Sequence, residues 1–92
     1  MTVRFSAKAQ GHIANIYQYI GLRNSVAAIA VVARIKMTTE LLVAFPRIGH
    51  EGTVRGTSEL VVKGLPYIIV YEVQEARSEV IVLGIFHGAQ ER

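Results

Sequence analysis

The sequence contains neither cysteine nor aspartate. The lack of cysteine excludes disulfides and thiolate metal sites, and it fits a reducing compartment. No stretch reaches the roughly 18 uninterrupted apolar residues of a membrane span, and the N-terminus lacks the basic start and apolar run of a secretory signal. We therefore expect a cytoplasmic protein with no membrane partner.

What is present is a short, hydrophobic and mildly basic chain. Its 92 residues have room for one domain, spanning 1–92. The hydrophobic fraction of 51% and the mean hydropathy of +0.35 are high for so small a domain, so some apolar side chains should lie on the surface where a partner could cover them. The net charge of +3 fits an acidic partner or nucleic acid, and equally an ordinary solvated surface.

The first half of the chain predicts a short strand and a helical hairpin. Alternation over residues 2–5 indicates an edge strand. Ser6 can cap a helix that runs to Gly21. Four apolar residues of this helix recur at i, i+3, i+4 and i+7 and form one face: Ile13, Ile16, Tyr17 and Ile20.

The second helix is expected over residues 25–44, capped by Asn24 or Ser25 and ended before Pro46. It is apolar on more than one side, so it is either buried on two sides or contacts a partner. Its main apolar stripe is formed by Val26, Ile29, Ala30, Ala33, Met37, Leu41 and Ala44. Four further apolar residues lie outside this stripe: Val31, Val32, Ile35 and Leu42.

The last third predicts three strands, over residues 58–63, 67–74 and 79–87, close enough in sequence to form an antiparallel meander. Because the helices precede the meander, the order indicates an α+β fold with the hairpin packed on one face of the sheet. Simple alternation in the last strand places His87 on the face of Ile81, Leu83 and Ile85, and Gly84 on the opposite face.

No strong catalytic motif is visible, and the three histidines are too dispersed to predict a metal site, so neither a metal nor a cofactor is expected. A diffuse set of basic or titratable groups occupies the loop at 46–56 and the sheet: Arg47, His50, Arg55, Lys63 and His87. Cations that hold a phosphodiester and a histidine that transfers a proton would suit metal-independent RNA cleavage. A strand-end histidine bonded to backbone is the alternative.

Four segments in the same order resemble the ParE/RelE superfamily: residues 46–49, 56–62, 66–71 and the ending His87-Gly88-Ala89-Gln90. This ending is typical of the ParE-like branch. The resemblance implies a toxin of a bacterial type II toxin–antitoxin module, with a twisted antiparallel sheet and a helical hairpin. ParE-like members poison DNA gyrase, whereas RelE-like members cleave messenger RNA on the ribosome.

The chain departs from the family pattern at positions where relatives commonly carry Arg: His50, Ser58, Glu72 and Gly84. We therefore expect a ParE-like gyrase inhibitor that is not an enzyme, neutralised by a cognate antitoxin (ParD-like or another type) in a hetero-oligomer. Two alternatives remain: a RelE-like ribosome-dependent endoribonuclease using His87, Arg55, Lys63 and Arg47, or an attenuated toxin that only binds its antitoxin.

Two sets of contact residues are predicted. The antitoxin-binding residues are Ile13, Tyr17, Ile20, Val32 and Ile35. The target-binding residues are Arg47, His50, Arg55, His87 and Gln90.

Overall fold

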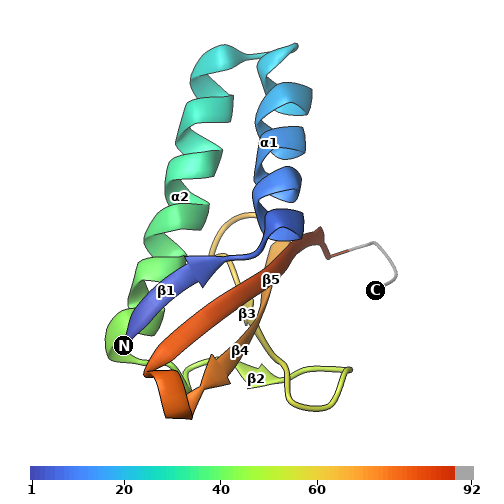
Figure 1. Cartoon of the computed structure of the whole chain (residues 1–92). Coiled ribbons are helices and arrows are strands. Elements are labelled where there is room, and N and C mark those ends of the chain that lie inside the picture. The colour runs from blue at the N-terminus through green and yellow to red at the C-terminus, as the bar shows by residue number, and fades with distance from the viewer. Residues whose placement is uncertain (89–92) are drawn as a thin grey trace.

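The computed structural model describes residues 1–88 and contains a helical hairpin on a mixed sheet (Figure 1). This arrangement confirms the predicted α+β class. The elements, in chain order, are β1 (Thr2–Phe5), α1 (Ala7–Gly21), α2 (Ser25–Ala44), β2 (His50–Glu51), β3 (Ser58–Val61), β4 (Tyr67–Gln74), the 3-10 turn η1 (Glu75–Arg77) and β5 (Glu79–His87).

The sheet has the strand order β1-β5-β4-β3-β2. Strands β3, β4 and β5 form the predicted antiparallel meander. Strand β1 lies at one edge, parallel to β5, with Val3 opposite Val80. Strand β2 was not predicted; it is a two-residue segment of the loop at 46–56, with His50 opposite Glu59.

Both helices begin where the sequence places a capping side chain. The Ser6 hydroxyl accepts from the Ala9 N–H at 3.0 Å, and the Asn24 side chain accepts from the Ala27 N–H at 3.0 Å. Each bond satisfies one of the free N–H groups of a first helical turn. The short connection between the helices makes them antiparallel neighbours, as predicted.

The predicted core stripe of α2 is wrong. The buried residues of this helix are Ala28, Ile35, Thr39 and Leu42, whereas Val26 is 75% exposed and Met37 is 69% exposed. Both sides of the helix are apolar, so periodicity could not tell which one faces the sheet. The positions of α1 and the sheet decide it, and the predicted stripe points outward. Within residues 1–88, no helix is long and apolar enough to cross a membrane.

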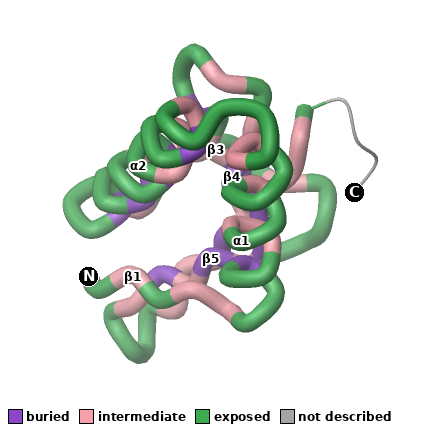
Figure 2. Tube along the Cα trace, turned by 90° about the horizontal axis from the view of Figure 1, so that it is seen from above, coloured by how far each residue is buried: buried purple, intermediate pink, exposed green. Residues whose placement is uncertain are grey.

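The core lies between the hairpin and one face of the sheet, where the buried residues gather (Figure 2). Tyr71 is fully buried there. Its hydroxyl donates to the Pro46 carbonyl at 2.9 Å and accepts from the Gly49 N–H at 3.0 Å. These two bonds hold the loop that follows α2 against the sheet.

A bulge in β5 changes which residues before and after it share a face, so the predicted grouping of His87 with Ile81 is wrong, although His87 does share a face with Ile85. Val82 lies opposite Tyr71, but Gly84 lies opposite Val70, so Leu83 is an extra residue. A bulge of this kind interrupts the alternation of side chains. Val82 and His87 therefore share the face toward the helices, whereas Gly84 lies on the other face. Phe86 shares that other face with Gly84, and Ile81 lies on it too, rather than beside His87.

Candidate functional site

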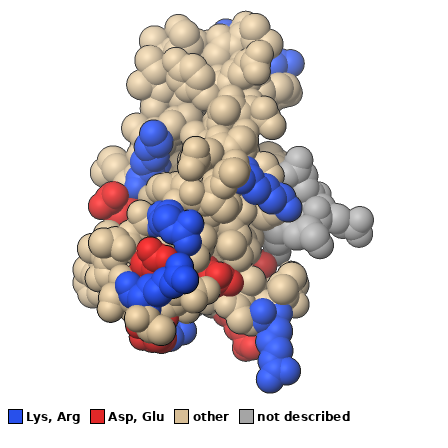
Figure 3. Space-filling model, viewed as in Figure 1, with Lys and Arg blue, Asp and Glu red and all other residues tan. Residues whose placement is uncertain are grey.

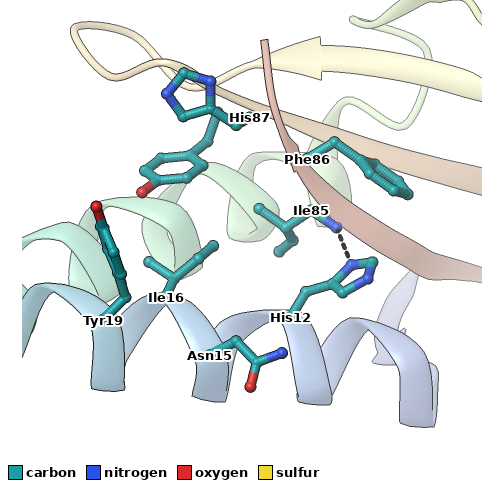
Figure 4. A pocket seen from close by; sticks show the side chains of 8 residues that line it. His12, Asn15, Ile16, Tyr19, Ile85, Phe86 and His87 are labelled. Carbon is teal, nitrogen blue, oxygen red and sulfur yellow. Dashed lines mark hydrogen bonds between the residues drawn. The ribbon is translucent and has the colours of Figure 1, made fainter. Parts of the chain in front are cut away.

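Helix α1 borders two cavities, one on each side. The first, which we call the aromatic pocket, has a volume of about 810 Å³ and lies between α1 and the adjoining ends of β4 and β5. Figure 4 shows Tyr19 on α1 and His87 on β5 at one end of the pocket, His12 and Phe86 at the other, and Ile16 and Ile85 between the two ends. Its lining consists of His12, Asn15, Ile16, Tyr19, Tyr67, Ile85, Phe86 and His87.

His12 continues the hydrogen bonding of β5 beyond the end of β1. Strand β1 stops at Phe5, opposite Val82. Three residues further along β5, the Ile85 N–H donates to His12 Nδ1 at 3.0 Å, as Figure 4 shows. Nδ1 must be unprotonated to accept this bond. Burial, and secondarily the nearby Lys8 charge, lower the pKa of His12 and so favour the neutral ring.

The same histidine explains why a glycine occupies position 84. The His12 and Phe86 rings meet edge to face, with centroids 5.0 Å apart. A Cβ on Gly84 would lie 2.7 Å from the Phe86 ring and 3.1 Å from His12 Cε1. A side chain at this position would therefore push the Phe86 ring aside and crowd the His12 ring.

The far end of the aromatic pocket is built from rings that meet edge to face. Tyr67 and His87 lie opposite each other on β4 and β5, and their ring centroids are 5.8 Å apart at an interplanar angle of 84°. Burial raises the pKa of Tyr67, with a smaller contribution from Tyr19. The guanidinium of Arg23 lies 4.2 Å from the Tyr19 ring centroid, so a cation is stacked on this ring.

The second cavity, which we call the apolar groove, has a volume of about 790 Å³ and lies between α1, α2 and the edge strand β1. It brings together three of the predicted antitoxin-binding residues: Ile13, Tyr17 and Val32. Ile20 is half-buried and is not part of this lining. Ile35 has no exposed surface, because it lies in the core. The full lining is Arg4, Phe5, Gln10, Ile13, Ala14, Tyr17, Val32, Lys36, Thr39 and Glu40.

The predicted target-binding and nuclease residues are dispersed. Arg47 is paired with Glu75, and His50 lies at the opposite sheet edge from β1. Arg55 is exposed in the loop, and Lys63 lies in the turn between β3 and β4. Within residues 1–88, His87 alone of this set lines the aromatic pocket, and Gln90 lies outside the described residues.

The face of the sheet turned away from the helices, here called the outer sheet face, is poor in cations. Cross-strand partners project to the same side, so the register places Glu59, Glu72 and Glu79 on this face. Arg4 also lies there and pairs with Glu79 at 3.4 Å. A third cavity, of about 450 Å³, covers part of this face, and its lining includes Lys8 and the nearly buried Glu59.

Sequence reasoning did not find the aromatic pocket. A signal was present, because His12, Ile16 and Tyr19 are spaced at i, i+4 and i+7 and therefore share one helix face. The sequence pattern did not reveal the bulge in β5, which turns His87 toward that helix face. Within residues 1–88, no three histidine or glutamate side chains gather as metal ligands.

Comparisons with known proteins agree on one family. A family model described as the ParE toxin of the type II toxin–antitoxin system parDE matches residues 3–92. A protein of Sinorhizobium fredii named "Putative toxin Y4kP" is 33% identical over 89 residues, which cover 97% of this chain and 90% of that protein.

Two solved structures share the fold. The chromosomal ParDE system of P. aeruginosa matches with a TM-score of 0.84 at 22% identity, over 95% of each chain. The E. coli RelBE toxin–antitoxin complex matches with a TM-score of 0.72 at 17% identity, over 99% of this chain and 98% of that one.

Proposed function

The chain belongs to the ParE toxin family of type II toxin–antitoxin systems, and from this premise we propose that it inhibits DNA gyrase and is neutralised by a cognate antitoxin. We choose gyrase rather than RNA as the target because of the charge of the outer sheet face. Glu59, Glu72 and Glu79 lie on it, and its Arg4 is paired with Glu79.

Such a face is unsuited to cleaving RNA. Holding a phosphodiester and stabilising the charge that develops during cleavage both require positioned cations. The carboxylates of this face outnumber the cations beside it, Arg4 and Lys8, so the face does not attract a phosphate. Two positions at which the family resemblance leads us to expect Arg also hold no cation here: Glu72 is acidic, and a side chain at Gly84 would have to displace the Phe86 ring.

The apolar groove is the surface we propose for the antitoxin. Phe5, Ile13 and Val32 supply apolar contact area, Lys36 supplies a cation, and Arg4, whose guanidinium pairs with Glu79, borders the same groove. The edge strand β1 adjoins it and has a pairing partner, β5, on one side only. A partner segment with alternating apolar and acidic side chains would be complementary to this surface.

A supercoiling assay tests the proposed target. Purified protein is expected to inhibit the supercoiling of relaxed plasmid by gyrase, and addition of the antitoxin encoded beside it should restore the activity. Messenger RNA should stay intact in a translation reaction that contains the same protein. If gyrase is unaffected at a large molar excess of this protein, the gyrase proposal fails.

The groove is tested separately by copurification with the antitoxin. Val32→Glu places a charge among its apolar residues and should weaken the complex strongly. Met37→Glu, on the outward side of the same helix, is the matched control and should leave binding unchanged. Equal effects of the two substitutions would show that the antitoxin does not use the groove.

A toxin that has lost its activity and only binds its antitoxin is the second candidate. The observation that favours it is the contrast between an assembled groove and the dispersed positions of Arg47, Arg55 and Lys63. It predicts normal antitoxin binding together with unaffected gyrase and intact transcripts.

A further inference from the structure

We propose that the aromatic pocket binds an unstacked nucleobase together with its phosphate, supplied by a free nucleotide or by a single strand of nucleic acid. This site lies beside α1 and apart from the apolar groove, and it shares Phe86 with the third cavity, at the outer sheet face. Its test needs neither gyrase nor antitoxin, so it stands or falls independently of the function proposed above.

The shape of the pocket suits a flat ring. Ile16 and Ile85 form an apolar floor, and the rings of Tyr19, Tyr67 and His87 stand around it (Figure 4). A volume of about 810 Å³ is within the range of small-molecule sites. Stacking on aromatic side chains is the usual way in which proteins hold an unpaired base, because every base presents a π face.

Tyr19 is the most exposed of these rings. Tyr19 is 61% exposed, although covering an aromatic ring of this size is energetically favourable. Arg23 stacks on it and also donates to its carbonyl at 3.2 Å, which fixes the cation beside the ring. A base that stacks on Tyr19 would therefore bring its phosphate close to a guanidinium.

The polar groups of the lining match the edge of a base rather than an aliphatic side chain. The hydroxyls of Tyr19 and Tyr67 and the amide of Asn15 offer both donors and acceptors. The His87 imidazole adds a further polar group beside Tyr67. Nucleobases present the complementary donors and acceptors along one edge.

The charge of the chain is concentrated around this pocket. Residues 9–35, 60–71 and 80–88, which include α1 from Ala9, the first half of α2 and the strand ends at the pocket, contain Arg23, Arg34 and Lys63 and no acidic residue. The rest of the described chain carries six Lys or Arg and six Glu, so it is neutral. In the view of Figure 3 the acidic side chains lie toward the sheet and none is seen on the hairpin tip.

Two of the three cations adjoin the strand that carries Tyr67. Arg34 Nη1 donates to the Lys63 carbonyl at 2.9 Å, in the turn that leads directly into β4. Arg23 stacks on Tyr19, which lines the pocket from α1, and Lys63 lies four residues before Tyr67, which lines it from β4. The three cations are near lining residues but are not part of the lining themselves. An uncharged aromatic side chain of a partner protein would gain little from such a field, whereas a phosphate is attracted by it.

The test measures binding of adenosine monophosphate by isothermal titration calorimetry, a readout that does not depend on any of the four tyrosines. Fluorescein-labelled oligothymidylate and oligouridylate are titrated in parallel by anisotropy. Tyr19→Ala should weaken binding at least about fivefold, the effect of removing a stacked base contact. Tyr17→Ala is the matched control, since Tyr17 lies two residues away but lines the apolar groove, and it should leave affinity unchanged.

Charge is tested by Arg23→Gln, which should weaken binding and reduce its dependence on salt. Arg77→Gln, in the neutral part of the chain, should change neither. Binding of the mononucleotide assigns the ligand to free nucleotides, and binding of the oligonucleotides alone assigns it to single strands. No saturable binding of any probe at millimolar concentration overturns the proposal, as does an equal loss in the Tyr17 and Tyr19 variants, with circular dichroism confirming that both are folded.

Discussion

The two sides of α1 show how one helix serves two different surfaces. Tyr17 and Tyr19 are two residues apart, yet Tyr17 opens into the apolar groove and Tyr19 into the aromatic pocket. The cavities have nearly equal volumes, about 790 and 810 Å³. Their chemistry differs because α1 meets α2 and β1 on one side, and β4 and β5 on the other. A side chain's neighbours across the fold, rather than its residue type, give each surface its character.

Electrostatics separates the two sides further. The groove is lined by charges of both signs, Arg4, Lys36 and Glu40. The segments that build the pocket carry only cations. Mixed charge with apolar area suits a protein partner, and an unopposed positive field suits a phosphate. Perturbing each side alone shows whether they are independent.

The largest expected effect comes from the core beneath the hairpin, which supports both cavities. Ile35→Ala removes a side chain with no exposed surface and should lower the free energy of unfolding by about 2–5 kcal/mol. Urea denaturation at neutral pH measures it. Met37→Ala, on the outward side of the same helix, should change it by less than about 0.5 kcal/mol. Similar losses in both variants would mean that α2 is turned differently.

An effect of intermediate size is expected from a substitution that disrupts the aromatic pocket alone. Gly84→Ala forces the Phe86 and His12 rings to move and should lower the free energy of unfolding by about 1–3 kcal/mol. Nucleotide binding should fall with it, while antitoxin binding stays normal.

The matched control is Gly11→Ala in α1, where an added Cβ meets no atom within 4 Å. This change should stabilise the protein by about 0.5–1 kcal/mol, because glycine in a helix interior is less favourable than alanine. A stabilising Gly84→Ala would contradict the packing described for His12 and Phe86.

The smallest expected effect is a dependence of stability on pH that belongs to the pocket side. The pKa of His12 is lowered below its ordinary 6.5 in the folded protein. Above that pH the ring is neutral in both states. As the pH falls below 6.5 the unfolded chain takes up the proton first, so folding stability decreases until the pH passes the folded pKa.

This effect is measured as the change in urea midpoint between about pH 7.5 and about pH 5.5. His12→Asn keeps an acceptor for the Ile85 N–H without titrating, so it should flatten the change. His50→Asn, at an exposed position, is the control and should retain the slope. An unchanged slope in the His12 variant would show that another group is responsible.

Much of the fold followed from local patterns. Ser6 and Asn24 cap the helices as predicted, because a cap needs only neighbouring residues. The three closing strands follow from alternation and turn residues. The partner of β1 did not, because pairing with β5 joins residues far apart in the sequence. The outward side of α2 was mistaken for the core side for a related reason. Both sides are apolar, so the pattern within one helix does not show which side packs on the sheet.

The candidate sites show the same difference between what local patterns predict and what contacts across the fold decide. Ile13, Tyr17 and Val32 were identified from helical periodicity and lie together in the groove, whereas Ile35, chosen by the same reasoning, is buried. The aromatic pocket depends on one extra residue, Leu83, which turns His87 toward α1. Periodicity assumes an uninterrupted strand, so it grouped His87 with Ile81, whereas the bulge places it with Val82.

The sequence by itself determined the two helices and their starts, the first strand, the closing meander and the family, because capping, periodicity and motifs act over a few neighbouring residues. The tertiary structure alone decided which apolar side of α2 is core, where β1 pairs and which rings enclose the pocket. These outcomes depend on a bulge and on contacts between distant segments. Such contacts contribute to the free energy only in the folded chain.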